Sequence, residues 1–219
     1  VRIITEEDLA AKDIYKTKNE FYTLKFKADN VPDFAFGISD HYLWDAVSFE
    51  PEHNSDRRVY CAAAYNLSSK DFVDVAFYAK EALKYYSYEM PAVPFPFPSA
   101  TVFNGSGGME FPMIVNNGSA STKAGTVHLT SHELCHQYLP FYMGTNERKY
   151  PFMDEGWAVM LPFDFQERTA EGYNPRERYV KTYEEFAGNE YDLPIMIPSP
   201  TISYRTYRTS AYNKSANAY

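Results

Sequence analysis

Two histidines four residues apart are the strongest chemical feature of this 219-residue sequence, in His132-Glu133-Leu134-Cys135-His136. Positions four apart on a helix share one face about one turn from each other, so both imidazoles can reach one metal ion. Glu133 would then lie beside the open coordination position, where its carboxylate can take a proton from a bound water. The pattern therefore predicts a catalytic metal site on a helix.

The alternative interpretation of the same five residues is a solvated polar helix face. The apolar residues Val127, Leu129 and Leu134 argue against it, because they indicate a largely buried helix. Buried imidazoles and carboxylates need partners, and a metal ion would provide one.

A third ligand is required, and the sequence offers Glu155, which lies 19 residues after His136. Two histidines and one glutamate leave a fourth position for water, which is the arrangement of catalytic zinc. Asp154 is the competing ligand, and spacing favours Glu155. His128 does not fit, because the step of eight helical positions from it to His136 rises about 12 Å, while ligand nitrogens lie about 2 Å from zinc.

The part of the chain before this motif divides into strands followed by a helix. Aromatic and β-branched runs predict strands at residues 21–27, 31–38, 42–49 and 58–65. Thr5 would cap a short helix before them. Apolar residues at a 3.6-residue period then predict a helix over 68–89, with Ser68 as its cap.

A proline-rich run at residues 91–98 predicts an extended connector after that helix. Strands are expected at 100–103 and 111–115, on either side of the glycine-rich segment 104–108. Further helices are expected at 124–138, from Met153 onward with a kink at Pro162, at 175–187 with Asn174 as cap, and at 206–219. Cys135 would face away from the two histidines as a small buried apolar residue.

Composition narrows the class of protein. The net charge of −8 and a pI near 5.2 argue against nucleic acid or an anionic membrane as the main partner. No apolar run reaches the roughly 18 residues of a membrane helix, and no signal peptide is recognisable at Val1. Two cysteines are too few for a disulfide framework. The compartment and the oligomeric state stay open.

The zinc motif and a second motif together resemble a known family. The pentapeptide followed by Glu155, with Gly107-Gly108-Met109-Glu110 upstream, resembles the aminopeptidase N family of gluzincin zinc metallopeptidases. The resemblance implies an edge strand in which Gly107, Gly108 and Met109 bind substrate through their backbone. It further implies that Glu110 pairs with the substrate's free α-amino group, as a charge-assisted contact. Phe111-Pro112 departs from the family's asparagine, and an ordinary hairpin turn is the alternative.

A third match lies near the end of the chain. Ala211-Tyr212-Asn213-Lys214-Ser215 resembles the family's Tyr-x-Lys-Gly segment, with serine in place of glycine. The resemblance implies that the Tyr212 hydroxyl hydrogen-bonds the oxyanion that develops during peptide hydrolysis. Packing within a helix is the alternative role for this tyrosine.

The resemblance also implies a fold and a function. Residues 1–56 would be the last strands of a β-sandwich-like domain, and 57–219 a thermolysin-like α+β catalytic domain that is truncated at its C-terminus. The expected activity is a zinc-dependent aminopeptidase with one Zn²⁺ per chain, Glu133 as general base, and peptides with a free amino terminus as substrates. A gluzincin endopeptidase and a non-catalytic peptide-binding domain that retains its zinc site are the alternatives.

Overall fold

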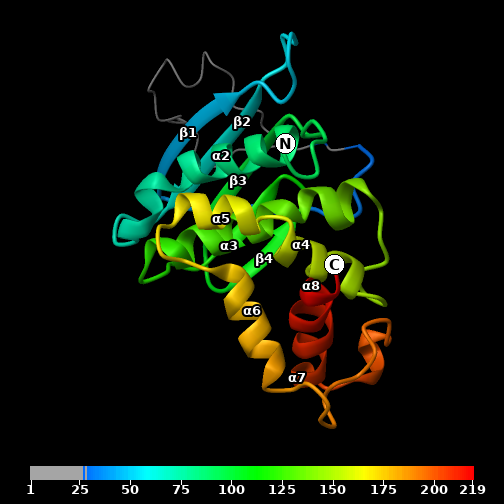
Figure 1. Ribbon diagram of the computed structural model, residues 1–219. Coiled ribbons are helices and arrows are strands. Elements are labelled where there is room, and N and C mark those ends of the chain that lie inside the picture. Colours follow the sequence, from blue (N-terminus) through cyan, green and yellow to red (C-terminus); the bar gives the residue numbers. More distant parts are fainter. Residues whose placement is uncertain (1–26, 28) are drawn as a thin grey trace.

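The computed structural model describes residue 27 and residues 29–219 (Figure 1). Its centre is a mixed five-stranded sheet with the strand order β1-β2-β3-β5-β4. The strands are Leu43–Phe49 (β1), Val59–Tyr65 (β2), Ser99–Asn104 (β3), Gly108–Phe111 (β4) and Ile114–Asn117 (β5). The two inner pairings, β2 with β3 and β3 with β5, are parallel, whereas β1 and β4 pair antiparallel at the edges. The predicted α+β fold class is confirmed.

The expected strand at 111–115 is wrong, because a tight turn divides it. Phe111 ends β4 and Ile114 begins β5, and the intervening Met113 has a φ of +65°. Proline lacks the N–H that a continuing strand needs, so Pro112 favours the turn. The two short strands form an antiparallel hairpin that leaves β4 at the open edge of the sheet.

Two other strand expectations have different outcomes. Residues 31–38 form no strand, and Phe34, Phe36 and Ile38 are exposed there. Apolar alternation predicts pairing only when a partner strand is available, and none lies alongside this segment among the described residues. The strand expected at 21–27 and the cap expected at Thr5 lie outside the described residues, apart from Lys27.

The strands expected at 42–49 and 58–65 are confirmed as β1 and β2. They pair along their whole length, from Leu43 opposite Tyr65 to Phe49 opposite Val59. The domain boundary expected after residue 56 therefore falls in the connection between two paired strands, and β1 belongs to the central sheet. The further division into a β-sandwich-like domain stays a prediction.

The first long helix is shorter than expected. A 3₁₀ turn, Lys70–Asp74 (η1), precedes Val75–Tyr88 (α2), and the Ser68 side chain caps neither. Asp71 accepts hydrogen bonds from the Ala120 amide and the Thr126 hydroxyl, which ties η1 to the start of the next helix. Together α2 and α3 (Lys123–Cys135) cover one face of the sheet (Figure 1).

Helix α3 carries the histidine motif and ends earlier than the expected residue 138. Thr122 caps its start by accepting a hydrogen bond from the Gly125 amide. Its end at Cys135 passes into a π-helical turn, Gln137–Tyr142 (η2), in which Leu139 is not helical. The residue before a proline is disfavoured in the α region, so Pro140 explains this break.

The remaining helices follow the expected order. Phe152–Met160 (α4) and Phe163–Thr169 (α5) are separated at Pro162, as the kink prediction stated. Pro175–Glu184 (α6) is capped by Asn174 as predicted, whose side chain accepts a hydrogen bond from the Glu177 amide, but the helix ends three residues before 187. After a 3₁₀ turn at Ser199–Thr201 (η3), the last helical segment comprises Tyr204–Tyr207 (α7), Arg208–Lys214 (η4) and Ser215–Ala218 (α8).

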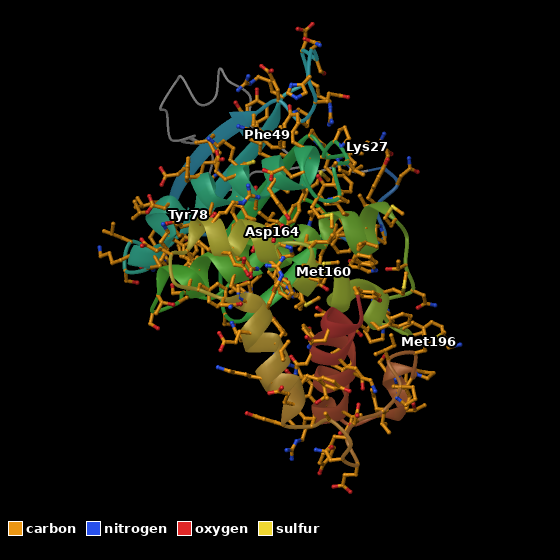
Figure 2. All side chains as sticks on the ribbon, in the orientation of Figure 1. Lys27, Phe49, Tyr78, Met160, Asp164 and Met196 are labelled. Atoms are coloured by element: carbon orange, nitrogen blue, oxygen red, sulfur yellow. The ribbon has the colours of Figure 1, made fainter. Side chains whose placement is uncertain are left out.

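Side chains of the main core fill the space between the sheet and its covering helices, whereas the exposed Met196 lies on the loop before η3 (Figure 2). A second, small cluster of Val159, Phe163, Tyr179 and Ala216 joins α4, α5, α6 and α8. That cluster anchors the last helical segment beside α4. Within the described part of the chain, no helix combines the length and apolar character needed to cross a membrane.

Candidate metal centre

The structure brings the three expected metal ligands to one buried point. His132 Nε2 lies 3.3 Å from His136 Nε2 and 3.3 Å from Glu155 Oε2, and His136 Nε2 lies 3.4 Å from the same oxygen. Helix α3 and its C-cap supply the imidazoles, and α4, packed against them, supplies the carboxylate. All three side chains are buried.

These separations fit a tetrahedral zinc site. Zinc bonds of about 2.0–2.1 Å at tetrahedral angles place neighbouring ligand atoms about 3.3–3.4 Å apart. Glu155 Oε2 and Glu133 Oε2 are buried and form no hydrogen bond. A buried carboxylate oxygen without a partner is costly, and a bound cation would satisfy it. The residues present therefore suit zinc.

The electrostatics of the centre also favour a cation. Burial by itself would lower the pKa of His136, but the charge of Asp154 and the nearby carboxylates raise it well above its ordinary value. Burial would raise the pKa of Glu155, yet its contacts with His132 and His136 lower it. An ionised carboxylate beside positive charge is the state that this environment stabilises.

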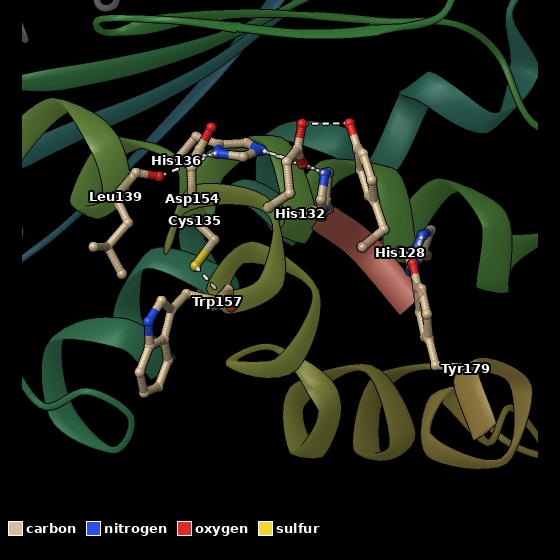
Figure 3. Close-up of polar contacts among 10 residues, drawn as sticks. His128, His132, Cys135, His136, Leu139, Asp154, Trp157 and Tyr179 are labelled. Atoms are coloured by element: carbon tan, nitrogen blue, oxygen red, sulfur yellow. Dashed lines mark hydrogen bonds and ion pairs between the residues drawn. The ribbon is translucent and has the colours of Figure 1, made fainter. Parts of the chain in front are cut away.

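Asp154 lies behind His136 and not among the three clustered ligand atoms (Figure 3). Its Oδ1 is 2.5 Å from His136 Nδ1, and the Leu139 carbonyl lies 3.1 Å from the same nitrogen. A proton held on Nδ1 by these acceptors leaves the Nε2 lone pair free for a metal. A carboxylate in this position orients a histidine that binds a metal through its other ring nitrogen.

Glu133 faces the space next to the ligand cluster. Burial raises the pKa of its carboxyl to about 7, against the opposing effect of the two histidines. A β-carbon on Gly108 would lie 2.3 Å from Glu133 Oε1, so only glycine lets β4 approach α3 this closely. Gly107, just before β4, has a φ of +74°, a backbone conformation that favours glycine.

The segment from Gly107 to Glu110 lies at one edge of the sheet. Gly108, Met109 and Glu110 belong to β4, the open edge strand, and Gly107 immediately precedes it. A Glu110 carboxylate oxygen lies within 4.8 Å of ligand atoms of both His136 and Asp154. The edge strand and its acidic side chain therefore border the metal centre.

Tyr212 also reaches the centre. Its hydroxyl donates a hydrogen bond to Glu155 Oε1, and its ring stacks on His132 at a centroid distance of 6.0 Å. Burial and the charge of Glu155 raise the pKa of Tyr212 above its ordinary value, so the hydroxyl stays protonated. In this structure its single proton is donated to Glu155, at the edge of the ligand cluster.

His128 lies one turn before His132 and outside the ligand cluster (Figure 3). Its Nε2 is 3.5 Å from the Tyr179 hydroxyl, and its Nδ1 is 3.4 Å from both Gln166 Oε1 and the Tyr173 hydroxyl. Burial lowers its pKa to about 3. The expectation that His128 packs near the site without joining the cluster is met.

Two residues at the site have no counterpart among the sequence expectations. Gln137, fully buried, accepts from the Met113 amide and donates to the Phe111 carbonyl, which fixes the β4–β5 hairpin to the end of the histidine helix. Glu147 lines a cavity of about 450 Å³ together with Glu110 and Glu155. In the sequence, only the position of Gln137 directly after His136 could have indicated that it lies at the site.

Comparison with solved structures identifies the architecture. An M1 zinc metallopeptidase from Deinococcus radiodurans aligns over 79% of this chain with a TM-score of 0.56 and 14% identity. The fold is that of the M1 zinc metallopeptidases. A mutant of the Deinococcus radiodurans M1 enzyme bound to a Tyr-Ser-Ala substrate aligns with a TM-score of 0.53 and 13% identity, again over 79% of this chain.

This likeness extends to the fold and to part of the neighbours' length. The alignments cover 38% of each of those two neighbours. No family model matches the sequence, and a search of curated protein sequences finds no match. The comparisons therefore show the fold of this chain and leave its metal centre untested.

Proposed function

We propose that this chain is the catalytic part of a zinc-dependent aminopeptidase, which hydrolyses the first peptide bond of peptides with a free amino terminus. The observation that carries the proposal is the separation of 3.3–3.4 Å among the ligand atoms of His132, His136 and Glu155. The M1 metallopeptidase fold supports it.

His132, His136 and Glu155 would hold the zinc ion. Zinc in such a site supplies Lewis acidity, because it lowers the pKa of a water molecule and polarises a carbonyl group. Asp154 holds the proton on His136 Nδ1, which keeps the ligand nitrogen available. Three protein ligands leave one coordination position open for chemistry.

Glu133 is the proposed general base. Its carboxylate takes a proton from the attacking water, the hydroxyl adds to the acyl carbon, and the same proton then passes to the leaving amine nitrogen as the carbon–nitrogen bond breaks. A pKa of about 7, raised by burial, suits a group that must both accept and deliver this proton near neutral pH. The Tyr212 hydroxyl donates to the oxyanion that develops on the carbonyl oxygen.

Glu110 and the β4 edge provide the proposed preference for the first residue. An extended peptide can add to the open edge strand through main-chain hydrogen bonds at Gly107, Gly108 and Met109. The Glu110 carboxylate, beside His136, then receives the α-ammonium. A carboxylate at this position would favour a substrate with a free amino terminus over one that continues upstream of the cleaved bond.

Paired substrates test this proposal. The zinc-loaded protein is incubated with Tyr-Ser-Ala and with its N-acetylated form, and products are separated by mass spectrometry. Release of free tyrosine from the unblocked peptide alone is expected. Equal cleavage of both peptides would favour an endopeptidase, and cleavage of neither, with zinc bound, would favour a non-catalytic binding domain.

A further inference from the structure

The proposed function leaves one positive charge beside the metal centre without a role. Arg208 begins η4, four residues before Tyr212, and its guanidinium carbon lies 4.5 Å from the centroid of the Tyr212 ring. The Tyr212 hydroxyl in turn donates to Glu155, one of the proposed metal ligands. Arg208 is also exposed to solvent. A single aromatic ring therefore separates an accessible cation from the ligand cluster.

A second arginine acts on the same part of the site. Arg178 lies on α6, which packs against η4 in the lower part of the molecule (Figure 1). The charges of Arg178 and Arg208 both act on His128. Both also act on the hydroxyl of Tyr179. Positive charge therefore gathers at the end of the site where His128 lies.

No carboxylate of the described chain neutralises these two arginines. Among residue 27 and residues 29–219, neither Arg178 nor Arg208 forms an ion pair. By contrast, Arg168 and Arg176 pair with carboxylates on the surface. A guanidinium presents a fork of N–H donors that matches a carboxylate, so an unpaired one beside a substrate site is suited to bind an anion.

The contacts of β4 give the direction that a bound peptide would take. Glu110 approaches His136, just after the end of α3. Gly108 lies closer to the start of that helix, because a β-carbon on it would lie 2.3 Å from Glu133 Oε1 and 2.8 Å from Leu129 Cδ1. A peptide with its amine at Glu110 and its first carbonyl beside Glu133 therefore runs antiparallel to β4, toward the earlier turns of α3.

Arg208 lies on the side toward which this peptide continues. Tyr212 stacks on His132, which is about 100° around α3 from Glu133, so η4 and β4 flank the ligand cluster from two sides. The charge of Arg208 extends to His128, one turn earlier on the helix. Each residue of an extended peptide spans about 3.3–3.6 Å, so one or two residues beyond the cleaved bond follow the same course.

We propose that Arg208 binds a substrate carboxylate on the leaving side of the cleaved bond, and that Arg178 adds positive charge there. The carboxylate is the C-terminus of a dipeptide or tripeptide, or an acidic side chain directly after the cleaved bond. The inference rests on the proposed function and specifies its substrate class. With Glu110 at one end and Arg208 at the other, the site complements both charges of a short zwitterionic peptide.

The test measures binding without turnover, in two pairs of peptides. Zinc-loaded Glu133→Gln protein is titrated calorimetrically with Tyr-Ser-Ala and its C-terminal amide, and with the C-terminal amides of Tyr-Glu-Ala and Tyr-Gln-Ala. Adding Arg208→Gln should weaken binding of the carboxylate member of a pair about tenfold and leave its neutral partner unchanged, because one charge-assisted contact is lost. A loss in the first pair identifies the terminal carboxylate, and a loss in the second identifies the side chain.

Two further variants make the result specific. Arg208→Lys keeps the positive charge without the planar fork, and it should weaken binding of the carboxylate peptide less than Arg208→Gln does. Arg205→Gln removes a positive charge from the same last helical segment. Because the Arg205 guanidinium lies over the rings of Phe186 and Tyr191, this variant should change neither pair.

Three results would overturn the inference. Equal weakening of acid and neutral peptides would assign Arg208 a packing role against Tyr212. Unchanged binding of all four peptides would remove the contact, and so would failure of the zinc-loaded parent protein to bind any of them. An equal loss in Arg205→Gln would assign the effect to overall charge and not to Arg208.

The inference and the proposed function can fail separately. If the wild type does not hydrolyse Tyr-Ser-Ala while Arg208→Gln weakens binding of a carboxylate peptide alone, the peptidase proposal fails and the carboxylate site stands. If Tyr-Ser-Ala is hydrolysed and Arg208→Gln changes no titration, only the carboxylate site is lost.

Discussion

The Tyr212 hydroxyl donates a hydrogen bond to Glu155, the carboxylate that α4 contributes to the metal centre. The two residues are 57 positions apart. The small cluster of Val159, Phe163, Tyr179 and Ala216 holds the last helical segment beside α4 and so makes the contact possible. The centre is thus built from three separate parts of the chain, namely α3, α4 and η4.

Tyr212→Phe tests whether this contact serves catalysis. It should lower kcat about 10²- to 10³-fold, the loss expected for one oxyanion donor, with zinc content unchanged. Steady-state kinetics and metal analysis on the same sample check it. If zinc affinity falls while kcat at saturating zinc is retained, the hydroxyl orients Glu155 and takes no part in the chemistry.

Glu133→Gln should lower turnover by about 10²- to 10⁴-fold, because the amide cannot accept the water's proton. The variant should still bind zinc, since Glu133 is not one of the three clustered ligand residues. Activity and zinc content are measured together. Loss of zinc from this variant would show that Glu133 is a ligand and not the base.

Asp154→Asn should weaken zinc binding about 10- to 100-fold, because the carboxylate no longer fixes the His136 proton on Nδ1. Competition with a chelator of known zinc affinity measures the change. Asp164→Asn, at an exposed ion pair with Arg176, is the matched control and should leave affinity unchanged. Equal affinity in both variants would contradict the orienting role of Asp154.

The largely buried His128 should make the free energy of unfolding depend on pH. Its folded pKa is about 3, against about 6.5 when unfolded, so between these values the unfolded state binds a proton that the folded state does not. The free energy of unfolding should therefore fall as the pH falls through this window, by up to about 1.4 kcal/mol per unit.

Urea denaturation of metal-free wild type and His128→Gln at pH 7 and pH 5 measures this dependence, without a contribution from zinc release. The variant should lose less stability on acidification than the wild type. Parallel losses in the two proteins would contradict the assignment.

Local periodicity explains which parts of the site were predictable. The i and i+4 spacing of His132 and His136 fixes their common face in any helix. Glu155 was predicted because catalytic zinc needs a third ligand and this carboxylate lies 19 residues after His136. Tyr212 was reached through family resemblance alone, since nothing local distinguishes it from the other tyrosines of the chain.

Features that depend on irregular backbone were not predictable. Glu147 lies in a connection without periodicity, so no pattern marks it as facing the cavity. The run from Phe111 to Val115 looks like one apolar strand, and only the pairing of β4 with β5 reveals its turn. The early end of α3 depends on Pro140 and on the hydrogen bonds of Gln137 to the hairpin.

Zinc content per chain tests the central claim most directly. Purified protein is saturated with zinc, passed through a desalting column and analysed by elemental mass spectrometry, alongside Glu155→Gln. We predict about one zinc per chain for the wild type and a large loss for the variant, because two histidines alone hold zinc weakly. A folded wild type that retains no zinc, or a variant that retains as much as the wild type, would contradict the account.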